Sequence, residues 1–371
     1  MQDIIIIGGG LAGLISAIQL AEAGLSVLLV EKKAYPFHRV CGEYISNEVV
    51  PFLRSIDAYP ASLQPTAIQR LLLTSASGRS ETMPLDLGGF GVSRYALDEF
   101  LYQRAQRAGA TFLLETQVQE VTFQNDLFTV TLPQNQQHTA RLVVGAYGKR
   151  SRLDKTLDRP FMKQRSPYIG VKYHLKTAFP DDLIALHNFE GGYCGISRVE
   201  GGRYNLCYLG SRASLRQHGS IEAMEERVLW RNPHLKEIFQ QSEFLLDRPE
   251  VINEISFAPK QPVVAHVLMV GDTAGLITPL CGNGMALAIH SAKILTELIV
   301  RHYRPEGFDR LALEQAYAQA WRRHFATRLW VGRQVQRLFG SRWMSEAGVQ
   351  LMKTLPGVAA QLMHRTHGRV F

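Results

Sequence analysis

The hydrophobic pattern at the start of the chain predicts a strand, a glycine turn, a helix and a second strand. Asp3 to Ile7 is an apolar, β-branched run typical of a buried strand. Leu11 to Ala23 spaces its apolar residues at helical intervals, and Gly24 is a natural helix stop. Leu25 to Val30 repeats the strand pattern and leads to Glu31. This alternation predicts an α/β fold with a parallel sheet.

Shorter patterns follow along the rest of the chain. Helices are expected over residues 46–55 and 95–108, and strands over 68–75, 81–84, 111–114, 117–123, 127–132 and 140–146. Four further strands are expected over 169–175, 183–189, 193–199 and 203–209, with a helix over 221–231. A strand over 263–270 and a helix from Met285 to about Val300 come next, and the remainder is expected to be helical. The middle of the chain should therefore form a mostly antiparallel sheet.

The composition is that of an ordinary globular protein. The 371 residues are 46% hydrophobic and 20% charged, a size that suits two or three domains of roughly 100–200 residues each. No apolar run approaches the roughly 18 residues that a membrane-spanning helix needs, and no basic segment precedes the first apolar run. The four scattered cysteines form no CxxC pair: Cys41, Cys194, Cys207 and Cys281. We expect a cytoplasmic protein with free thiols.

The net charge of +8 is concentrated at the C-terminus. Residues 316–371 hold nine Lys and Arg against one acid, Glu346, and 9 − 1 = +8 accounts for the whole excess. Large apolar residues lie among these cations: Trp321, Phe325, Leu329, Trp330, Leu338, Phe339 and Trp343. The favoured interpretation is a helical cap whose aromatic rings pack inward. The alternative is weak contact with an anionic membrane surface, and the absence of a nucleic-acid-binding motif argues against a nucleic-acid partner.

A dinucleotide-binding motif follows the first strand. Gly8-x-Gly10-x-x-Gly13 opens the first helix, and Glu31 ends the second strand 18 residues after the last glycine. Gly8 permits the tight turn, Gly10 lets a pyrophosphate approach the backbone, and Gly13 lets the helix pack on the strand. The helix N-terminus can then bind the phosphates. Glu31 would bind the adenosine ribose, so FAD or NAD is expected rather than NADP.

A second glycine-rich segment lies far downstream and points to a flavin. Gly271-Asp272 ends the expected strand at 263–270, and the run from Pro279 to Gly284 leads into the helix at Met285. Asp272 can bind ribityl hydroxyls, and the glycines let the backbone pass close to a flat ring. The helix would point its positive end at the ring.

With these motifs and the Arg39-Val40-Cys41-Gly42-Glu43 stretch, the chain resembles the p-hydroxybenzoate hydroxylase-like flavoproteins, and most closely their geranylgeranyl-reductase-type branch. The resemblance implies that Arg94 contacts the phosphate–ribityl part of FAD and that Val118 contacts the adenine. The full set of expected cofactor-binding residues is Gly8, Gly10, Leu11, Ala12, Gly13, Glu31, Lys32, Arg39, Cys41, Gly42, Arg94, Val118, Gly271, Asp272, Pro279, Gly282, Gly284 and Met285.

Two departures from the family pattern matter. An Asp-Gly pair of the family is replaced by Tyr147-Gly148, which puts direct use of nicotinamide in doubt, although NAD(P)H stays the candidate external reductant. Prenyl reductases carry a Tyr-x-Trp-x-Phe-Pro segment, whereas the nearest match here, at residues 192–197, has the Tyr but lacks Trp, Phe and Pro. The Trp-x-Trp-x-Ile-Pro segment of flavin halogenases is absent as well.

The Arg39–Glu43 stretch holds the one candidate catalytic side chain, Cys41. Nearby cations would favour its thiolate, and the alternative is a small buried residue in a tight loop. Glu43 is expected to hold that loop by accepting backbone N–H bonds. The histidines have no metal-ligand spacing, so no metal is expected and the lone histidines are interpreted as structural: His174, His187 and His290.

These observations predict a Rossmann-type, glutathione-reductase-like FAD domain (1–67, 90–158 and 259–308), an inserted β-rich substrate domain (68–89 and 159–258) and a helical C-terminal region (309–371). An apolar or aromatic small molecule should bind beside Tyr173, Phe189 and Tyr193. The leading function is flavin-dependent hydroxylation, since the cofactor carries that chemistry. The alternatives are reduction or dehydrogenation of C=C bonds in a prenyl or polyene chain, and a non-catalytic, membrane-associated FAD-binding role.

Overall fold

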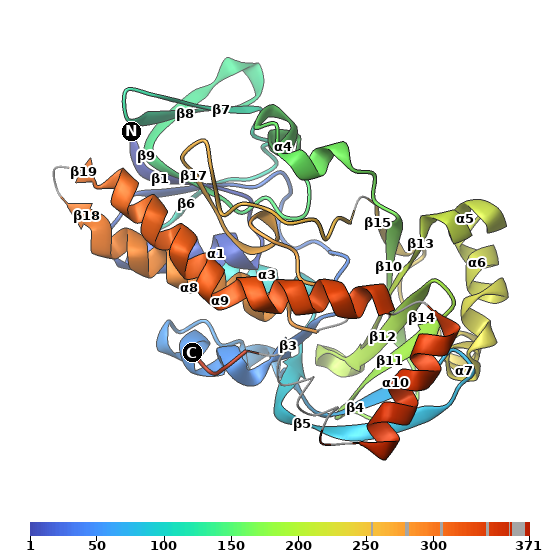
Figure 1. The fold of residues 1–371 in the computed structure, drawn as a ribbon. Helices are drawn as coiled ribbons and strands as arrows, with labels where there is room; N and C mark the ends of the chain where they lie inside the picture. Colours follow the sequence, from blue (N-terminus) through green and yellow to red (C-terminus); the bar gives the residue numbers. More distant parts are fainter. Residues whose placement is uncertain (254, 279–281, 305–306, 339–340, 356, 358–367) are drawn as a thin grey trace.

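The computed structural model contains two large sheets, each with its own helices (Figure 1). It describes the chain except residues 254, 279–281, 305–306, 339–340, 356 and 358–367. The first sheet runs in the order β16 (Val263–Val264), β17 (Val267–Met269), β9 (Gln137–Gly145), β1 (Gln2–Ile7), β2 (Val27–Val30), β6 (Thr111–Leu113). β7 (Glu120–Gln124) and β8 (Leu127–Thr131) extend it beside β9.

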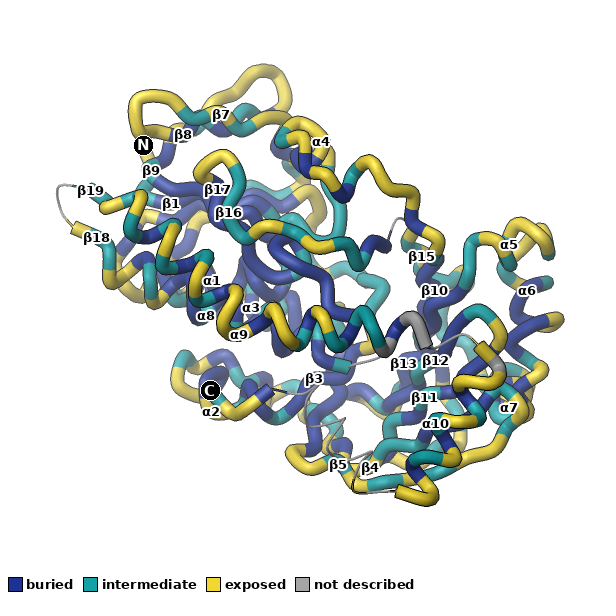
Figure 2. The backbone as a smooth tube through the Cα atoms, viewed as in Figure 1, coloured by how far each residue is buried: buried dark blue, intermediate teal, exposed yellow. Residues whose placement is uncertain are grey.

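The centre of the first sheet is parallel and buried on both faces. β1 pairs in parallel with β2 and β9, and its residues Ile4 to Ile7 are buried, as the dark tube in Figure 2 shows. α1 (Leu11–Glu22) packs against α3 (Arg94–Arg107) and α8 (Gly284–His302). This arrangement confirms the α/β expectation, because a parallel sheet needs helical cover and near-continuous apolar strands.

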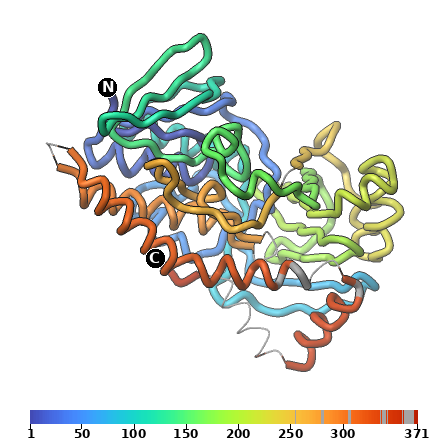
Figure 3. Tube along the Cα trace, turned by 45° about the horizontal axis from the view of Figure 1, so that its top comes forward, coloured from blue at the N-terminus to red at the C-terminus, as the bar shows by residue number. Residues whose placement is uncertain are grey.

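The second sheet is antiparallel apart from one pair. Its order is β14 (Glu243–Phe244), β10 (Tyr168–Lys176), β13 (Tyr204–Ser211), β12 (Gly192–Arg198), β11 (Leu183–Phe189), β4 (Thr66–Thr74), β5 (Ser80–Gly91), β3 (Tyr44–Ser46), and β15 (Glu250–Asn253) also pairs with β10. β11 and β4 are parallel. α5 (Arg212–His218), α6 (Ile221–Arg227) and α7 (Pro233–Gln241) lie at one side of this sheet (Figures 1 and 3).

Two expectations about these elements are corrected. The strand expected over 263–270 is instead a short hairpin, because Ala265 and His266 adopt left-handed backbone angles, φ 47° and 66°, between β16 and β17. The helix expected over 46–55 is preceded by β3, and only α2 (Val50–Ser55) is α-helical. The sequence gives no local signal for the hairpin, since neither left-handed position is a glycine.

The C-terminal region is helical, as expected, in α9 (Arg310–Leu338) and α10 (Arg342–Thr354), after a small hairpin of β18 (Tyr303–Arg304) and β19 (Gly307–Phe308). On α9, Trp321 and Phe325 are buried and the Tyr317 hydroxyl donates to the Met269 carbonyl at 2.6 Å, which supports the helical-cap interpretation. Trp330 and Trp343 are exposed instead. None of the described helices is both long and apolar enough to cross a membrane.

A buried carboxylate lies behind the second sheet. The hydroxyls of Tyr173 and Tyr208 donate to Glu225 Oε1 at 2.9 and 2.8 Å. Burial raises the pKa of Glu225 to about 7, and the two tyrosine hydrogen bonds lower it only in part. The folded protein therefore binds a proton at Glu225 that the unfolded chain has already released above its ordinary pKa of 4.5.

We expect the free energy of unfolding to fall as pH rises from about 4.5 to 7. A group whose pKa is raised on folding stabilises the folded state only below that raised pKa. Glu225→Gln should flatten this part of the stability profile by up to about 3 kcal/mol, at 1.36 kcal/mol per pKa unit. Urea unfolding at pH 5 and pH 8 measures the effect. Glu226→Gln is the control, because Glu226 is exposed on the same helix. An identical pH profile for Glu225→Gln and wild type would contradict the prediction.

Candidate active site

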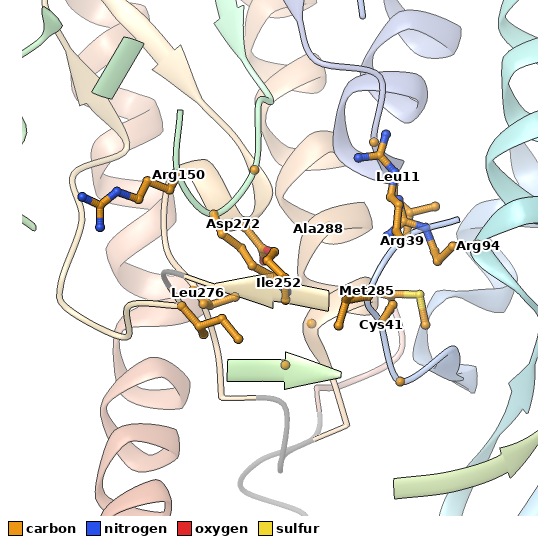
Figure 4. Close-up of a pocket in the computed structure, with 18 of the residues that line it drawn as sticks. Leu11, Arg39, Cys41, Arg94, Arg150, Ile252, Asp272, Leu276, Met285 and Ala288 are labelled. Atoms are coloured by element: carbon orange, nitrogen blue, oxygen red, sulfur yellow. The ribbon is translucent and has the colours of Figure 1, made fainter. Parts of the chain in front are cut away.

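A cavity of about 980 Å³ lies between the two sheets and is lined by residues from both. Figure 4 shows labelled residues of its wall, with Arg39, Arg94 and Leu11 on one side and Leu276 and Ile252 on another. One half of the cavity follows the glycine turn and the start of α1. The other half lies against the second sheet. One cavity therefore joins the glycine turn to the second sheet.

In the half of the cavity beside the glycine turn, a ligand can approach the backbone. Gly10 is the N-cap of α1 and no side chain caps the helix, so the first backbone N–H groups face the cavity. Among the described residues, a Cβ on Gly10 would meet only Arg94 Nη2, at 3.7 Å. A Cβ on Gly13, in contrast, would lie 2.0 Å from the Gly8 carbonyl oxygen. Gly10 therefore leaves room for an anion, and Gly13 permits close packing of helix on strand.

Acidic and basic side chains surround this helix start. Glu31 is buried, and its Oε2 accepts the Gly9 N–H at 2.7 Å and a 3.4 Å hydrogen bond from Arg39 Nη2. Arg39 and Arg94 both donate to the carboxylate of Asp98. Burial opposes the charge of Arg94, but Asp98 and Cys41 raise its pKa above the ordinary value. Asp98 thus fixes both guanidinium groups beside the place where phosphates would bind.

The downstream glycine segment closes the same cavity from α8. Asp272 lies in the turn Gly271–Thr273 and lines the cavity, as do Gly282, Gly284 and Met285. The ammonium of Lys260 donates to the carbonyls of Lys149 and Asp272 at 2.7 and 2.8 Å, and burial lowers its pKa to about 8. The N-terminal end of α8, at Gly284 and Met285, faces the cavity.

Most of the expected cofactor-binding residues meet in this one cavity. Its wall contains Gly8, Gly10, Leu11, Ala12, Glu31, Lys32, Arg39, Cys41, Gly42, Arg94, Val118, Asp272, Gly282, Gly284 and Met285. Gly13 and Gly271 lie just behind it, where a Cβ on Gly271 would meet Ala12 and Ala288 at 3.1 and 3.4 Å. Pro279 lies outside the described residues.

The expected substrate-contacting residues need a correction. Tyr193 lines the cavity, but Tyr173 and Phe189 do not. They belong to the hydrophobic core between the second sheet and its helices, together with Tyr208, Met224 and others. Side chains alternate along a strand, so Tyr173 points to the opposite face from Lys172 and His174.

A buried ionic cluster, for which no local sequence pattern provides a signal, holds the Arg39–Glu43 loop. Glu43, at a left-handed φ of 54°, accepts Lys172 Nζ at 2.5 Å and the Arg94 backbone N–H at 2.8 Å on Oε1, and His174 Nε2 at 2.7 Å on Oε2. Lys172 Nζ also donates to the Arg39 carbonyl at 3.2 Å. Burial alone would raise the pKa of Glu43, but Lys172 and His174 lower it below its ordinary value.

Glu43 therefore holds its loop, as expected, although through side chains of β10 as much as through a backbone N–H. His174 is part of this cluster and is not isolated. Cys41 lines the cavity next to it and is half-buried, and its catalytic role stays a prediction. Among the described residues no cluster of His, Cys, Asp or Glu could hold a metal ion.

The cavity fits FAD. An uncapped helix start, an open Gly10, two half-buried arginines and a buried carboxylate match a diphosphate and a ribose. Val118 and Thr116 line the end beside Glu31, where an adenine would lie, and Asp272 and the start of α8 line the path toward Cys41. These groups form one continuous wall, as an extended flavin dinucleotide requires.

Comparison with known proteins identifies the family. A model of the FAD binding domain family matches residues 1–330. The chain is 25% identical to digeranylgeranylglycerophospholipid reductase 2 of Methanopyrus kandleri over 345 residues, 87% of this chain and 83% of that protein. Two solved structures share the fold at 18% identity. The flavin-dependent brominase Bmp2 has a TM-score of 0.79 and covers 98% of this chain and 93% of its own. A geranylgeranyl bacteriochlorophyll reductase-like protein of Thermoplasma acidophilum has a TM-score of 0.78 and covers 98% of this chain and 95% of its own.

These matches agree with the cavity described above. The family match covers the glycine turn, the Arg39–Glu43 loop and the downstream glycine segment, whose residues line the cavity that fits FAD. The chain therefore belongs to the FAD binding domain family of p-hydroxybenzoate hydroxylase-like flavoproteins, and it is an FAD-dependent oxidoreductase.

Proposed function

We propose that the protein reduces carbon–carbon double bonds in an apolar, prenyl-like chain, or oxidises the saturated chain in reverse. The observation that carries this proposal is the apolar half of the cavity, where Tyr193, Leu209, Ile255 and Leu276 cluster beside Leu186, directly beyond the FAD wall. The match to a reductase of a digeranylgeranyl lipid over most of both chains supports the same chemistry.

Bound FAD would supply or accept the hydride. The residues of this chain bind and orient the two partners. The helix start at Gly10 and the cations Arg39 and Arg94 hold the diphosphate, and Glu31 holds the ribose. The apolar wall aligns the chain of the substrate and keeps water away from the reacting carbons.

Hydroxylation, which the sequence placed first, stays the second candidate. The cavity is enclosed between two sheets, and flavin hydroxylation needs no dedicated acid–base pair from the protein. Docking of the C-terminal helices on an anionic membrane stays a separate proposal, supported by the exposed Trp330 and Trp343 among the basic residues of that region.

Anaerobic reoxidation separates the two reactions. We expect dithionite-reduced holoenzyme to become oxidised on mixing with geranylgeraniol without air, and mass spectrometry should show that the product has gained two hydrogen atoms. Reduced enzyme mixed with buffer alone is the control. Reoxidation that needs air, with a product that has gained one oxygen atom, would replace the reductase assignment with hydroxylation.

A further inference from the structure

Two loops at the carboxyl edge of the first sheet lie beside the cavity. β9 and β17 are parallel neighbours, and their ends lead into residues 147–150 and into the turn Gly271–Thr273. Residues 147–150 all line the cavity, and so does Asp272. In Figure 4, Asp272 lies apart from Arg39 and Arg94, which are at the glycine turn. The two loops therefore form a part of the wall beyond the expected diphosphate site.

Thr273 and Lys260 tie these two loops together. The Thr273 hydroxyl accepts the Gly148 N–H at 2.8 Å and donates to the Gly148 carbonyl at 3.3 Å. The Lys260 ammonium donates to the carbonyls of Lys149 and Asp272, at 2.7 and 2.8 Å. Lys260 itself belongs to neither loop, so one side chain holds a backbone group of each.

The positive charge of Lys260 strengthens this link. Two carbonyl oxygens that converge on one point repel each other, because each carries a partial negative charge. An ammonium between them removes that repulsion, and its hydrogen bonds are roughly twice as strong as those of a neutral donor. The ammonium also lies over the Phe161 ring, 4.3 Å from the ring centroid, where the negative face of the ring favours a cation. A neutral side chain at this position would hold the loops less firmly.

The groups around Lys260 decide at which pH its charge is lost. Burial is the largest influence and lowers the pKa of Lys260 from its ordinary 10.5 to about 8. Asp272 and Asp154 oppose this shift, whereas Arg159 and Lys149 add to it. Arg159 is buried and pairs with Asp154 at 2.8 Å, so these two opposite charges lie close together. Lys260 therefore changes charge just above neutral pH.

We infer that Lys260 is a positioning residue for the flavin end of FAD, because its ammonium holds residues 147–150 and Asp272 in the arrangement in which they line the cavity. When the charge is lost, the two carbonyls separate and both loops lose contact with FAD. The adenosine and the diphosphate bind at Gly10 and Glu31, outside these loops, and do not depend on Lys260. The inference concerns cofactor binding alone, so it holds for reduction and for hydroxylation.

The test compares FAD with ADP, which lacks the riboflavin part. Apoprotein is titrated with FAD by fluorescence, and ADP is measured by its competition with FAD. We expect Lys260→Met to weaken FAD about tenfold at pH 7, close to the smallest effect of a hydrogen bond to a charged group, and to change ADP affinity by less than about twofold. Equal weakening of both ligands would indicate a general loss of structure and would overturn the positioning role.

The pH profile of wild type gives a second readout, which needs no variant. Bound FAD holds both loops on the ammonium and favours its charged form, so FAD binding raises the pKa of Lys260. Wild-type affinity for FAD should therefore be constant below about pH 8 and fall above it, by at most about tenfold per pH unit for one proton. The affinity for ADP should show no such fall, and neither should the affinity of Lys260→Met for FAD.

Lys163→Met is the matched control, because Lys163 is two residues from Phe161 and its side chain is 71% exposed. It should keep the wild-type FAD affinity and pH profile. The inference would be overturned by a wild-type FAD affinity that stays constant from about pH 7 to about pH 9.5. Wild-type FAD affinity in Lys260→Met at pH 7 would overturn it as well. Since no turnover is measured, failure of double-bond reduction leaves this result unaffected.

Discussion

Gly10→Val is expected to yield a folded, colourless protein that cannot be reconstituted with FAD. The backbone at Gly10 has φ −86°, which any residue can adopt, and no atom of the described residues lies closer to a Cβ there than Arg94 Nη2, at 3.7 Å. The valine methyl groups would therefore leave the fold intact and occupy the place of the diphosphate. Losing one charge-assisted hydrogen bond costs about 1.5–3 kcal/mol, so losing two lowers FAD affinity by at least about a hundredfold.

Fluorescence titration of the apoprotein with FAD measures this loss, and circular dichroism reports the fold. Gly348→Val is the control, because Gly348 lies in α10 with nothing within 4 Å of its Cβ position. Gly13→Val should differ from both, since its Cβ would lie 2.0 Å from the Gly8 carbonyl oxygen and the first helix could not pack. A yellow Gly10→Val protein with wild-type affinity would show that the diphosphate binds elsewhere.

Lys172→Met is expected to lower the free energy of unfolding by about 3–5 kcal/mol, the cost of leaving one charge of a buried pair alone. Lys172 and Glu43 are both completely buried, and Lys172 Nζ lies 2.5 Å from Glu43 Oε1. Without the ammonium, the partners of the Glu43 carboxylate within the described part of the chain are His174 and one backbone N–H. Urea unfolding at pH 7 measures the loss.

The double variant Glu43→Gln, Lys172→Met should recover a large part of this stability, because no charge is then stranded. Lys176→Met is the control: Lys176 lies on the same strand, is exposed, and its 3.5 Å ion pair with Glu243 is worth at most about 1 kcal/mol. A loss below about 1 kcal/mol in Lys172→Met would mean that the buried pair does not hold the loop.

The elements near the start of the chain could be predicted because their signals are local. The apolar run ending at Ile7, the glycines that follow and Glu31 each fix a neighbouring turn or strand end, and the observed β1 and α1 agree with them. The hairpin at residues 263–269 could not be predicted, because Ala265 and His266 adopt left-handed angles that other parts of the fold impose.

The substrate side of the cavity was harder to predict for a different reason. Both faces of the second sheet carry apolar residues: one face packs against helices and the other lines the cavity. Hydrophobic alternation therefore does not show which face binds a ligand. Tyr173 and Phe189 lie on the helix-covered face, and of the three expected residues only Tyr193 lines the cavity. The Glu43–Lys172 pair joins residues 129 positions apart and has no local signal at all.

A crystal structure of the oxidised holoenzyme with geranylgeraniol would test most directly whether one cavity holds both cofactor and apolar substrate. We expect the FAD diphosphate at Gly10 between Arg39 and Arg94, and the isoprenoid chain against Tyr193 and Leu276. An isoprenoid chain bound outside the space between the two sheets, with FAD in place, would contradict this expectation.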